Sequence, residues 1–390
     1  MNSKTSRRDF LSASLVVPAA GFASTTHQSS KLKASDSSQL SAPTPKLEYR
    51  TLGKTGLKVT SVGFGCMITS DPSVIERAAD LGINYFDTAR GYQHGNNERM
   101  VGAALKRRRK EVFLSSKSGA GNKADALRDL DTSLSELATD HLDIWYLHEK
   151  DTLDAVRDDL IEAQQIAKAQ GKIRFAGLST HQPPRMIPLL VEKGTFDVVL
   201  MTYNFTMQQS MDAAIEQANR AGMGVIAMKV MAGGFRKVKP GDPAWAKLRQ
   251  EGTMLAALKW VLRNPGIDTT VPSMTDMDQL EENLKAMNER YTPADQKLLA
   301  QHLDYITPLY CRMCGECTGT CVRGLPVADL LRYLTYADGY GQFALGREKF
   351  RELPAELAAV RCTDCAACTV HCPAGVQVSS RLRRAQELFA

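Results

Sequence analysis

Two stretches of the sequence, beginning at Cys311 and at Cys362, share one cysteine spacing, C-x2-C-x2-C-x3-C. Together they hold eight of the nine cysteines. Three thiolates placed two residues apart can wrap one face of an iron–sulfur cubane. Zinc sites more often use two separated C-x2-C pairs, covalent haem needs a C-x2-C-H motif that the sequence lacks, and disulfides are the alternative for an exported chain. The repeat therefore predicts two 4Fe–4S clusters.

The repeat resembles that of bacterial-type ferredoxins, in which the fourth cysteine of each copy reaches the other cluster. The resemblance implies one cluster on Cys311, Cys314, Cys317 and Cys372, and a second on Cys362, Cys365, Cys368 and Cys321. The 40 residues from Val322 to Arg361 exceed a minimal ferredoxin hairpin. Two stretches within them, VADLLRYLTYADGY and GREKFREL, predict inserted helices.

Four other side chains that could do chemistry follow short apolar segments. Asp87 and Tyr92 lie in FDTARGY, Lys117 ends LSSK, and His148 ends WYLH. Each alone would more often be a structural hydrogen-bonding residue. The ends of these successive segments carry a carboxylate, a phenol, an ammonium group and an imidazole. Together these groups could hold and move a proton.

The apolar segments that must position these side chains alternate with amphipathic helices from Leu47 to about residue 300. Eight strands are predicted, namely VTSVGFG, NYFD, EVFLSS, LDIWYLH, IRFAGLS, FDVVLMT, GVIAMK and TTVPS. Helical stretches such as PSVIERAADLG and QSMDAAIEQANRAG separate them. Eight strand–helix units in about 250 residues favour an α/β fold of the (β/α)8 barrel type, whose chemistry lies at the carboxyl ends of the strands. No G-x-G-x-x-G follows the first strand, which disfavours an open dinucleotide-binding sheet.

The stretches YRTLGKTGLKVTSVGFG, NYFDTARGY, GKIRFAGLS and QLEENL resemble the aldo-keto reductases, over residues 47 to about 290. The resemblance implies a catalytic tetrad of Asp87, Tyr92, Lys117 and His148 that reduces carbonyls or oxidises alcohols. Tyr92 would donate the proton to the carbonyl oxygen. Lys117, held by Asp87, would lower the pKa of the phenol, and His148 would orient the carbonyl.

The same resemblance gives a less complete nicotinamide site. Ser179 is present, but Thr180 replaces an Asn, and Leu200 stands where a Gln would hold the carboxamide. The stretch VPSMTDMDQLEEN lacks the cations that pair with the 2′-phosphate of NADPH, although Asn283 matches an adenine contact. Lys229, after the seventh strand, could meet a phosphate or merely line the pocket. The sequence leaves NADP(H) open as a cofactor.

The N-terminal stretch SRRDFLSASLVVPAA joins two arginines to a short apolar run and small residues. It resembles a twin-arginine export signal, which implies the twin-arginine export machinery as a partner and a periplasmic or otherwise exported location. Iron–sulfur clusters are assembled in the cytoplasm, so a route for folded cargo agrees with the cysteine repeat. A disordered basic arm is the alternative. The Ser/Thr/Pro-rich residues 24–46 predict a flexible linker.

Charge and hydropathy limit the partners. The formal charge is +6, but residues 1–46 hold six Lys/Arg and two Asp/Glu, so the remainder is nearly neutral and no nucleic acid is expected. No later stretch has the apolar length of a membrane helix, so no stable membrane anchor is expected. We predict three parts, a signal and linker over 1–46, the barrel over 47–300 and a small helical, ferredoxin-like domain over 301–390.

Three functions fit these features. The first is an exported oxidoreductase whose barrel exchanges electrons with the clusters, acts on a small carbonyl or alcohol, and meets a redox protein or a quinone-linked carrier. The second is an NADPH carbonyl reductase with a structural or regulatory ferredoxin tail. The third is a non-enzymatic electron carrier or assembly partner. Cys66, near the expected pocket, is predicted to be a buried core residue rather than a reactive one.

Overall fold

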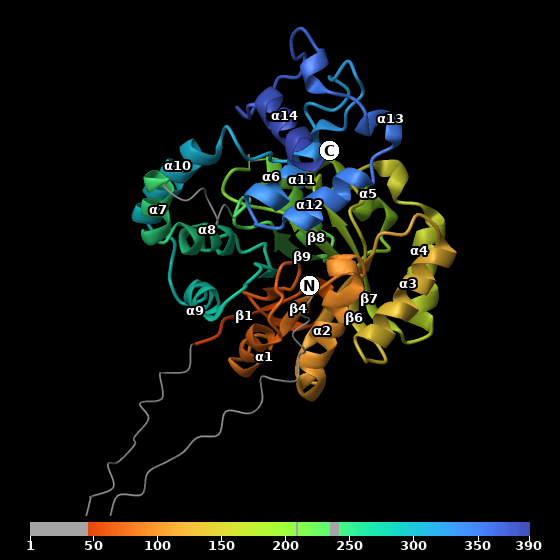
Figure 1. Cartoon of the computed structure of the whole chain (residues 1–390). Coiled ribbons are helices and arrows are strands. Elements are labelled where there is room, and N and C mark those ends of the chain that lie inside the picture. The colour runs from red at the N-terminus through yellow and green to blue at the C-terminus, as the bar shows by residue number, and fades with distance from the viewer. Residues whose placement is uncertain (1–45, 208–209, 235–241) are drawn as a thin grey trace, which may run out of the picture. The chain divides into compact units, whose positions relative to one another are not determined.

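A closed barrel of eight parallel strands forms the centre of the fold (Figure 1). Neighbouring strands pair in sequence order from β3 to β10, and bridges from Val62 to Thr270 and from Gly65 to Ser273 close the ring. The strands are β3 (Phe64–Gly65), β4 (Tyr85–Asp87), β5 (Phe113–Ser118), β6 (Leu142–Leu147), β7 (Ile173–Thr180), β8 (Val198–Thr202), β9 (Gly224–Met228) and β10 (Thr269–Thr270). The predicted (β/α)8 barrel is confirmed.

The computed structural model describes residues 46–207, 210–234 and 242–390. The predicted export signal and nearly all of the predicted linker lie outside these residues. The described residues belong to one compact unit. Across the described part of the chain, no helix is both long enough and apolar enough to cross a bilayer.

Helices surround the barrel because each buries an apolar stripe against the strands (Figure 1). In the first of them, Val74, Ile75, Ala78 and Ala79 are buried, and Asp71 caps the amino end by accepting a hydrogen bond from the backbone N–H of Ser73. The helices of this part are α1 (Pro72–Asp80), α2 (Asn96–Leu105), α3 (Lys123–Glu136), α4 (Asp158–Ala169), α5 (Pro183–Lys193), α6 (Ser210–Arg220), α7 (Pro243–Gln250), α8 (Thr253–Leu262), α9 (Met277–Lys285) and α10 (Pro293–Ile306).

A hairpin covers the amino end of the barrel. Its strands β1 (Tyr49–Thr51) and β2 (Lys58–Thr60) pair antiparallel, and Lys54 N donates to Gly222 O, just before β9, at 2.7 Å. The predicted first strand VTSVGFG is thus divided, because Val59 and Thr60 pair in the hairpin, whereas Val62 and Phe64–Gly65 pair with barrel strands.

Alternate strand residues fill the inside of the barrel, as the two-residue period of a strand requires. Tyr85 and Tyr146 are buried there and their hydroxyls lie 2.9 Å apart. Gly177 faces the ring of Tyr146 so closely that an added Cβ would lie 2.4 Å from it. The barrel is therefore a packed core, and any ligand site must lie at its end.

The C-terminal region is helical between and after the cysteine motifs. It contains α11 (Val327–Asp338), α12 (Phe343–Arg351), α13 (Ala355–Ala358) and α14 (Val378–Phe389), which share a small hydrophobic core around Leu330, Leu334 and Leu382. The first two are the helices predicted between the motifs. Figure 1 shows α11 and α12 beside the barrel and α13 and α14 farther from it.

Candidate active site

The carboxyl ends of β4 and β5 bring three of the four predicted catalytic residues together. Lys117 Nζ lies 2.6 Å from Asp87 Oδ2 and 3.3 Å from the hydroxyl oxygen of Tyr92. It also donates to Thr88 O at 2.6 Å, while Ser115 Oγ donates to the second oxygen of Asp87 at 2.7 Å. Lys117 and Asp87 are buried, so this network holds the ammonium group in place.

His148 completes the set from the end of β6. Its ring lies 5.9 Å from the ring of Tyr92, edge to face at 76°. Burial lowers the pKa of His148 to about 3, so the imidazole is neutral at physiological pH. A neutral imidazole can donate one hydrogen bond to a carbonyl oxygen. The four predicted residues therefore form one group at the carboxyl end of the barrel.

Tyr92 differs from its predicted acidity. Burial, together with the nearby carboxylates of Asp87 and Glu149, raises the pKa of the phenol well above its usual value. The predicted net lowering of this pKa is wrong, because burial outweighs any stabilisation of the phenolate by Lys117, which lies 3.3 Å from the hydroxyl oxygen. The phenol is therefore protonated at neutral pH and can give up its proton only to an oxygen that is gaining negative charge.

A cavity of about 880 Å³, which we call the mouth cavity, lies above these residues. Its volume falls in the range of small-molecule sites. Asp87, Tyr92 and His148 line one side of it. The other side is formed by the C-terminal region, through Tyr336, Gly339, Tyr340, Gln342, Leu345 and Lys349. Substrate bound at the tetrad would therefore also face α11 and α12.

Contacts between side chains fasten α11 to the barrel. Arg332, which is 9% exposed, places Nη1 2.7 Å from Glu149 Oε1, directly after His148. That carboxylate lines the mouth cavity, and Arg332 holds its pKa well below the usual value although burial acts in the opposite direction. Nearer the cysteines, Gln182 Nε2 donates to Met313 O.

The eight C-terminal cysteines line two separate cavities, four in each. One is lined by Cys311, Cys314, Cys317 and Cys372, and the other by Cys321, Cys362, Cys365 and Cys368. These are the two crossed sets that the ferredoxin-like spacing implies. Burial raises the pKa of the Cys311 thiol to about 12, so a metal is needed to hold it as a thiolate. The donor sets fit 4Fe–4S clusters.

Residues 71–304 match the Aldo/keto reductase family. The chain belongs to the aldo/keto reductase family. Residues 310–377 match the 4Fe-4S dicluster domain, which includes all eight C-terminal cysteines. The molecule is therefore an aldo/keto reductase that carries an iron–sulfur domain after its barrel.

Similar proteins match this aldo/keto reductase over the barrel. The uncharacterized oxidoreductase YqkF of Bacillus subtilis is 28% identical over 298 residues, which cover 66% of this chain and 96% of that protein. L-galactose dehydrogenase of Arabidopsis thaliana is 30% identical over 286 residues, 63% of this chain and 89% of that enzyme. The holo structure of aldo-keto reductase AKR11C1 from Bacillus halodurans has a TM-score of 0.57 at 27% identity, covering 65% of this chain and 96% of that structure.

The nicotinamide end of the predicted cofactor site fits poorly in this aldo/keto reductase. Ser179 lines the mouth cavity, but its hydroxyl already accepts a hydrogen bond from Glu149 N at 2.8 Å. Thr180 is buried, and its hydroxyl lies 3.0 Å from Asp151, so its prediction as a cofactor ligand is not supported. Leu200 lines the cavity with an apolar side chain. These positions offer little to hold a carboxamide.

The predicted adenine contact is a buried residue. Asn283 is fully buried, and neither polar atom of its side-chain amide has a hydrogen-bond partner among the residues that the structure describes. Gln279, one helical turn earlier on α9, lines the mouth cavity. A buried amide without a partner is costly, and buried polar groups of this kind often mark a functional position. Asn283 is not among the residues that line the mouth cavity, so its contact with adenine stays a prediction.

Several residues at the mouth cavity were not predicted from the sequence. Glu149 and His181 directly follow residues that were predicted, so the strand-end signal could have found them. Tyr336 lies in a stretch whose periodicity predicted the helix α11 but not the surface on which that helix docks. Cys66 is buried, as predicted, and burial strongly raises the pKa of its thiol.

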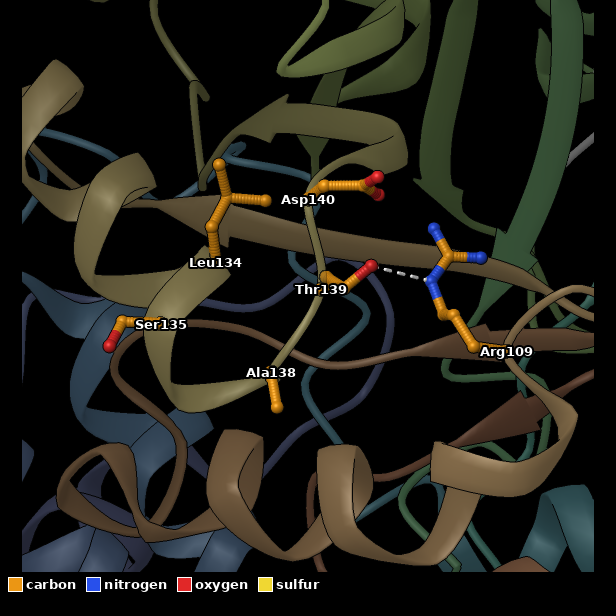
Figure 2. Close-up of a pocket in the computed structure, with 6 residues that line it drawn as sticks. All are labelled: Arg109, Leu134, Ser135, Ala138, Thr139 and Asp140. Carbon is orange, nitrogen blue, oxygen red and sulfur yellow. Dashed lines mark hydrogen bonds between the residues drawn. The ribbon is translucent and has the colours of Figure 1, made fainter.

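A second recess lies on the outer surface of the aldo/keto reductase barrel (Figure 2). In it, Arg109 Nε donates to Thr139 Oγ1 at 2.9 Å. Both residues come shortly before strands, Arg109 before β5 and Thr139 before β6, whereas barrel chemistry lies where strands end. None of the predicted catalytic residues lines this recess.

Proposed function

We propose that this aldo/keto reductase is an exported oxidoreductase that exchanges electrons between its two 4Fe–4S clusters and a small carbonyl or alcohol bound in the mouth cavity. Helix α11 carries the proposal, because it contacts both sites. Leu331 lines the cavity of the Cys311 set, and the next residue, Arg332, pairs with Glu149 at the mouth cavity. A cluster bound by the Cys311 set and a substrate bound in the mouth cavity would therefore both lie next to α11.

The loop after β7 gives a second connection between the same two sites. His181 lines the mouth cavity, and its ring Nδ1 lies 2.8 Å from Asp151. Its neighbour Gln182 donates to Met313 O, within the first cysteine motif. Two independent segments of the chain therefore join the Cys311 set to the candidate active site. The Cys362 motif is held differently, because Cys362 N donates to Gln386 Oε1 of α14 at 2.9 Å.

The tetrad can supply the proton chemistry. Reduction of a carbonyl to an alcohol takes up two electrons and two protons, and two bound clusters would supply the electrons one at a time. His148 donates a hydrogen bond that orients the carbonyl oxygen. Tyr92 gives its phenolic proton to that oxygen as negative charge develops, and Lys117 stabilises the phenolate that remains. Solvent supplies the second proton, to carbon, and then reprotonates Tyr92; alcohol oxidation reverses each step.

The electron donor distinguishes this function from its alternative. Holoprotein reconstituted without oxygen should reduce benzaldehyde to benzyl alcohol with reduced methyl viologen as the donor. NADPH in place of the viologen should give little product. Fast reduction by NADPH, in protein whose clusters stay oxidised, would contradict the proposal.

An NADPH-dependent carbonyl reductase with a structural or regulatory iron–sulfur tail is the second candidate. The unpartnered amide of Asn283 supports it, since the family resemblance assigns an adenine contact to that residue. A chain ending after residue 305 should then keep its NADPH turnover, provided that circular dichroism shows a folded barrel. Under the first proposal the shortened chain is inactive with viologen and with NADPH.

Export is the remaining part of the proposal, supported by Arg7-Arg8 and the apolar run after them. The outer partner would be a redox protein or a quinone-linked carrier. In a bacterial host with a twin-arginine system, the full chain should reach the periplasm with iron bound. Replacing both arginines by lysine should keep it in the cytoplasm, while unchanged export of that variant would contradict the twin-arginine assignment.

A further inference from the structure

Lys229 stands in an unusual backbone conformation at the mouth cavity. It directly follows β9 with a φ of 56°, in the left-handed region that residues with a Cβ rarely adopt. Its carbonyl oxygen accepts hydrogen bonds from Asn204 Nδ2 at 3.1 Å and from Ala232 N at 3.0 Å, which hold the turn. Strained residues of this kind gather at functional sites.

The ammonium group of Lys229 meets aromatic rings rather than a carboxylate. Its Nζ lies 5.3 Å from the ring centre of Tyr336 and 5.9 Å from that of Tyr340, two stacked residues of the C-terminal region. Among the described residues, no hydrogen bond or ion pair is made by this Nζ. The ring faces stabilise a cation only in part.

The nearest carboxylates are already paired. Glu149 is bound by Arg332 at 2.7 Å, and Asp151 accepts hydrogen bonds from His181 N at 2.6 Å and from the Thr180 hydroxyl at 3.0 Å. Burial, with repulsion from Arg332, lowers the pKa of Lys229 to about 8. A cation so placed lacks a partner that an anionic ligand would supply.

We infer that Lys229, with Tyr336 and Tyr340, forms an anion-binding subsite shared by the barrel and the iron–sulfur domain. All three residues line the same cavity as Tyr92 and His148. A ligand whose carboxylate or phosphate binds Lys229 can therefore extend toward the tetrad. The proposed function is deepened by this inference, because the molecule bound in the mouth cavity would carry a negative charge.

Binding of small anions tests the subsite without any turnover. Calorimetry on anaerobic holoprotein would use benzoate as a carboxylate, inorganic phosphate and adenosine 5′-diphosphate as phosphates, and benzyl alcohol as a neutral probe. We expect Lys229→Met to weaken anion binding by about tenfold or more, the loss of a charge-assisted contact, and to leave benzyl alcohol unchanged. Lys229→Arg should restore part of the affinity.

Lys150 provides a matched control. It lines the same cavity, but its Nζ already donates to Ala120 O at 3.2 Å. Lys150→Met should therefore change benzoate and phosphate binding by no more than about twofold. Iron content and circular dichroism would show that each variant is folded.

The probes also separate two sources of the anion. Benzoate binding that depends on Lys229 indicates a substrate carboxylate, and phosphate or diphosphate binding that depends on it indicates a phosphorylated ligand. Either result supports the subsite. Equal affinities of wild type and Lys229→Met for every anion, or no anion binding by wild type, would overturn it, even if electron transfer through the clusters is real.

Discussion

The two walls of the mouth cavity are built differently. On the barrel wall, Asp87 and Lys117 lie at the carboxyl ends of neighbouring parallel strands and are fixed by short hydrogen bonds to backbone and side chains. On the opposite wall, α11 is fastened by side chains, chiefly Arg332 on Glu149 and Tyr336 against Lys229. The barrel wall can position a proton donor. Under the proposed function, the wall formed by α11 would set what the donor faces and where electrons arrive.

Loss of the proton donor should give the largest effect. Tyr92→Phe keeps the ring that packs against His148 but removes the hydroxyl group. Turnover with reduced viologen should fall by about 100-fold or more, as expected for a lost general acid. Steady-state rates, with iron content as the control, would check this. Near-normal turnover would show that Tyr92 is not the proton donor, and the barrel wall would then lack a group for that step.

Removing the contact that fastens α11 to the barrel should lower both the stability of the protein and the rate of electron transfer. Arg332→Met leaves the partly buried carboxylate of Glu149 without its cation, at a cost of about 2 kcal/mol in the free energy of unfolding, between the values for surface and buried pairs. The rate at which the clusters transfer electrons to the substrate should fall as well. Arg347→Met, on the neighbouring α12, is a suitable control. Within the described residues, the Arg347 guanidinium makes no ion pair and lies over the ring of Phe343 on the same helix. Equal unfolding midpoints for the two variants would show that Arg332 does not fasten the wall.

The pH dependence of anion binding tests whether Lys229 is the cation of the proposed anion-binding subsite. With a pKa of about 8, Lys229 is an ammonium group below that pH and loses its charge above it. Arg332 and Lys117 face it as cations, and Glu149 and Asp151 as anions. Benzoate keeps its charge throughout, so its affinity should be constant below pH 7 and fall by up to about tenfold per unit well above pH 8. A flat profile from pH 6 to pH 10 would assign the binding to another cation.

Asn283 should give the smallest effect on stability. Because neither polar atom of its buried amide has a partner in the described structure, Asn283→Leu should leave stability unchanged or raise it by about 1 kcal/mol. Adenosine 5′-diphosphate binding, if present, should weaken in this variant. A clear loss of stability in chemical denaturation would mean that the amide serves the fold itself.

The barrel was predictable because its signals are local. Strands, the order of Asp87, Lys117 and His148, and the cysteine spacing can all be read from neighbouring residues. The helix α11 was predictable for the same reason, but its docking depends on Arg332 finding Glu149, a contact between residues far apart in the sequence. The direction of the pKa shift of Tyr92 was missed because it depends chiefly on burial of the phenol.

A single-turnover experiment tests the proposed electron path most directly. Anaerobic holoprotein with reduced clusters would be mixed rapidly with benzaldehyde, with no nicotinamide present, while cluster absorption and benzyl alcohol are followed. We predict that both clusters reoxidise as one alcohol forms for every two electrons, and that Tyr92→Phe slows both signals equally. Clusters that stay reduced in the presence of benzaldehyde, while NADPH drives alcohol formation in the same preparation, would contradict electron transfer between the iron–sulfur domain and the barrel.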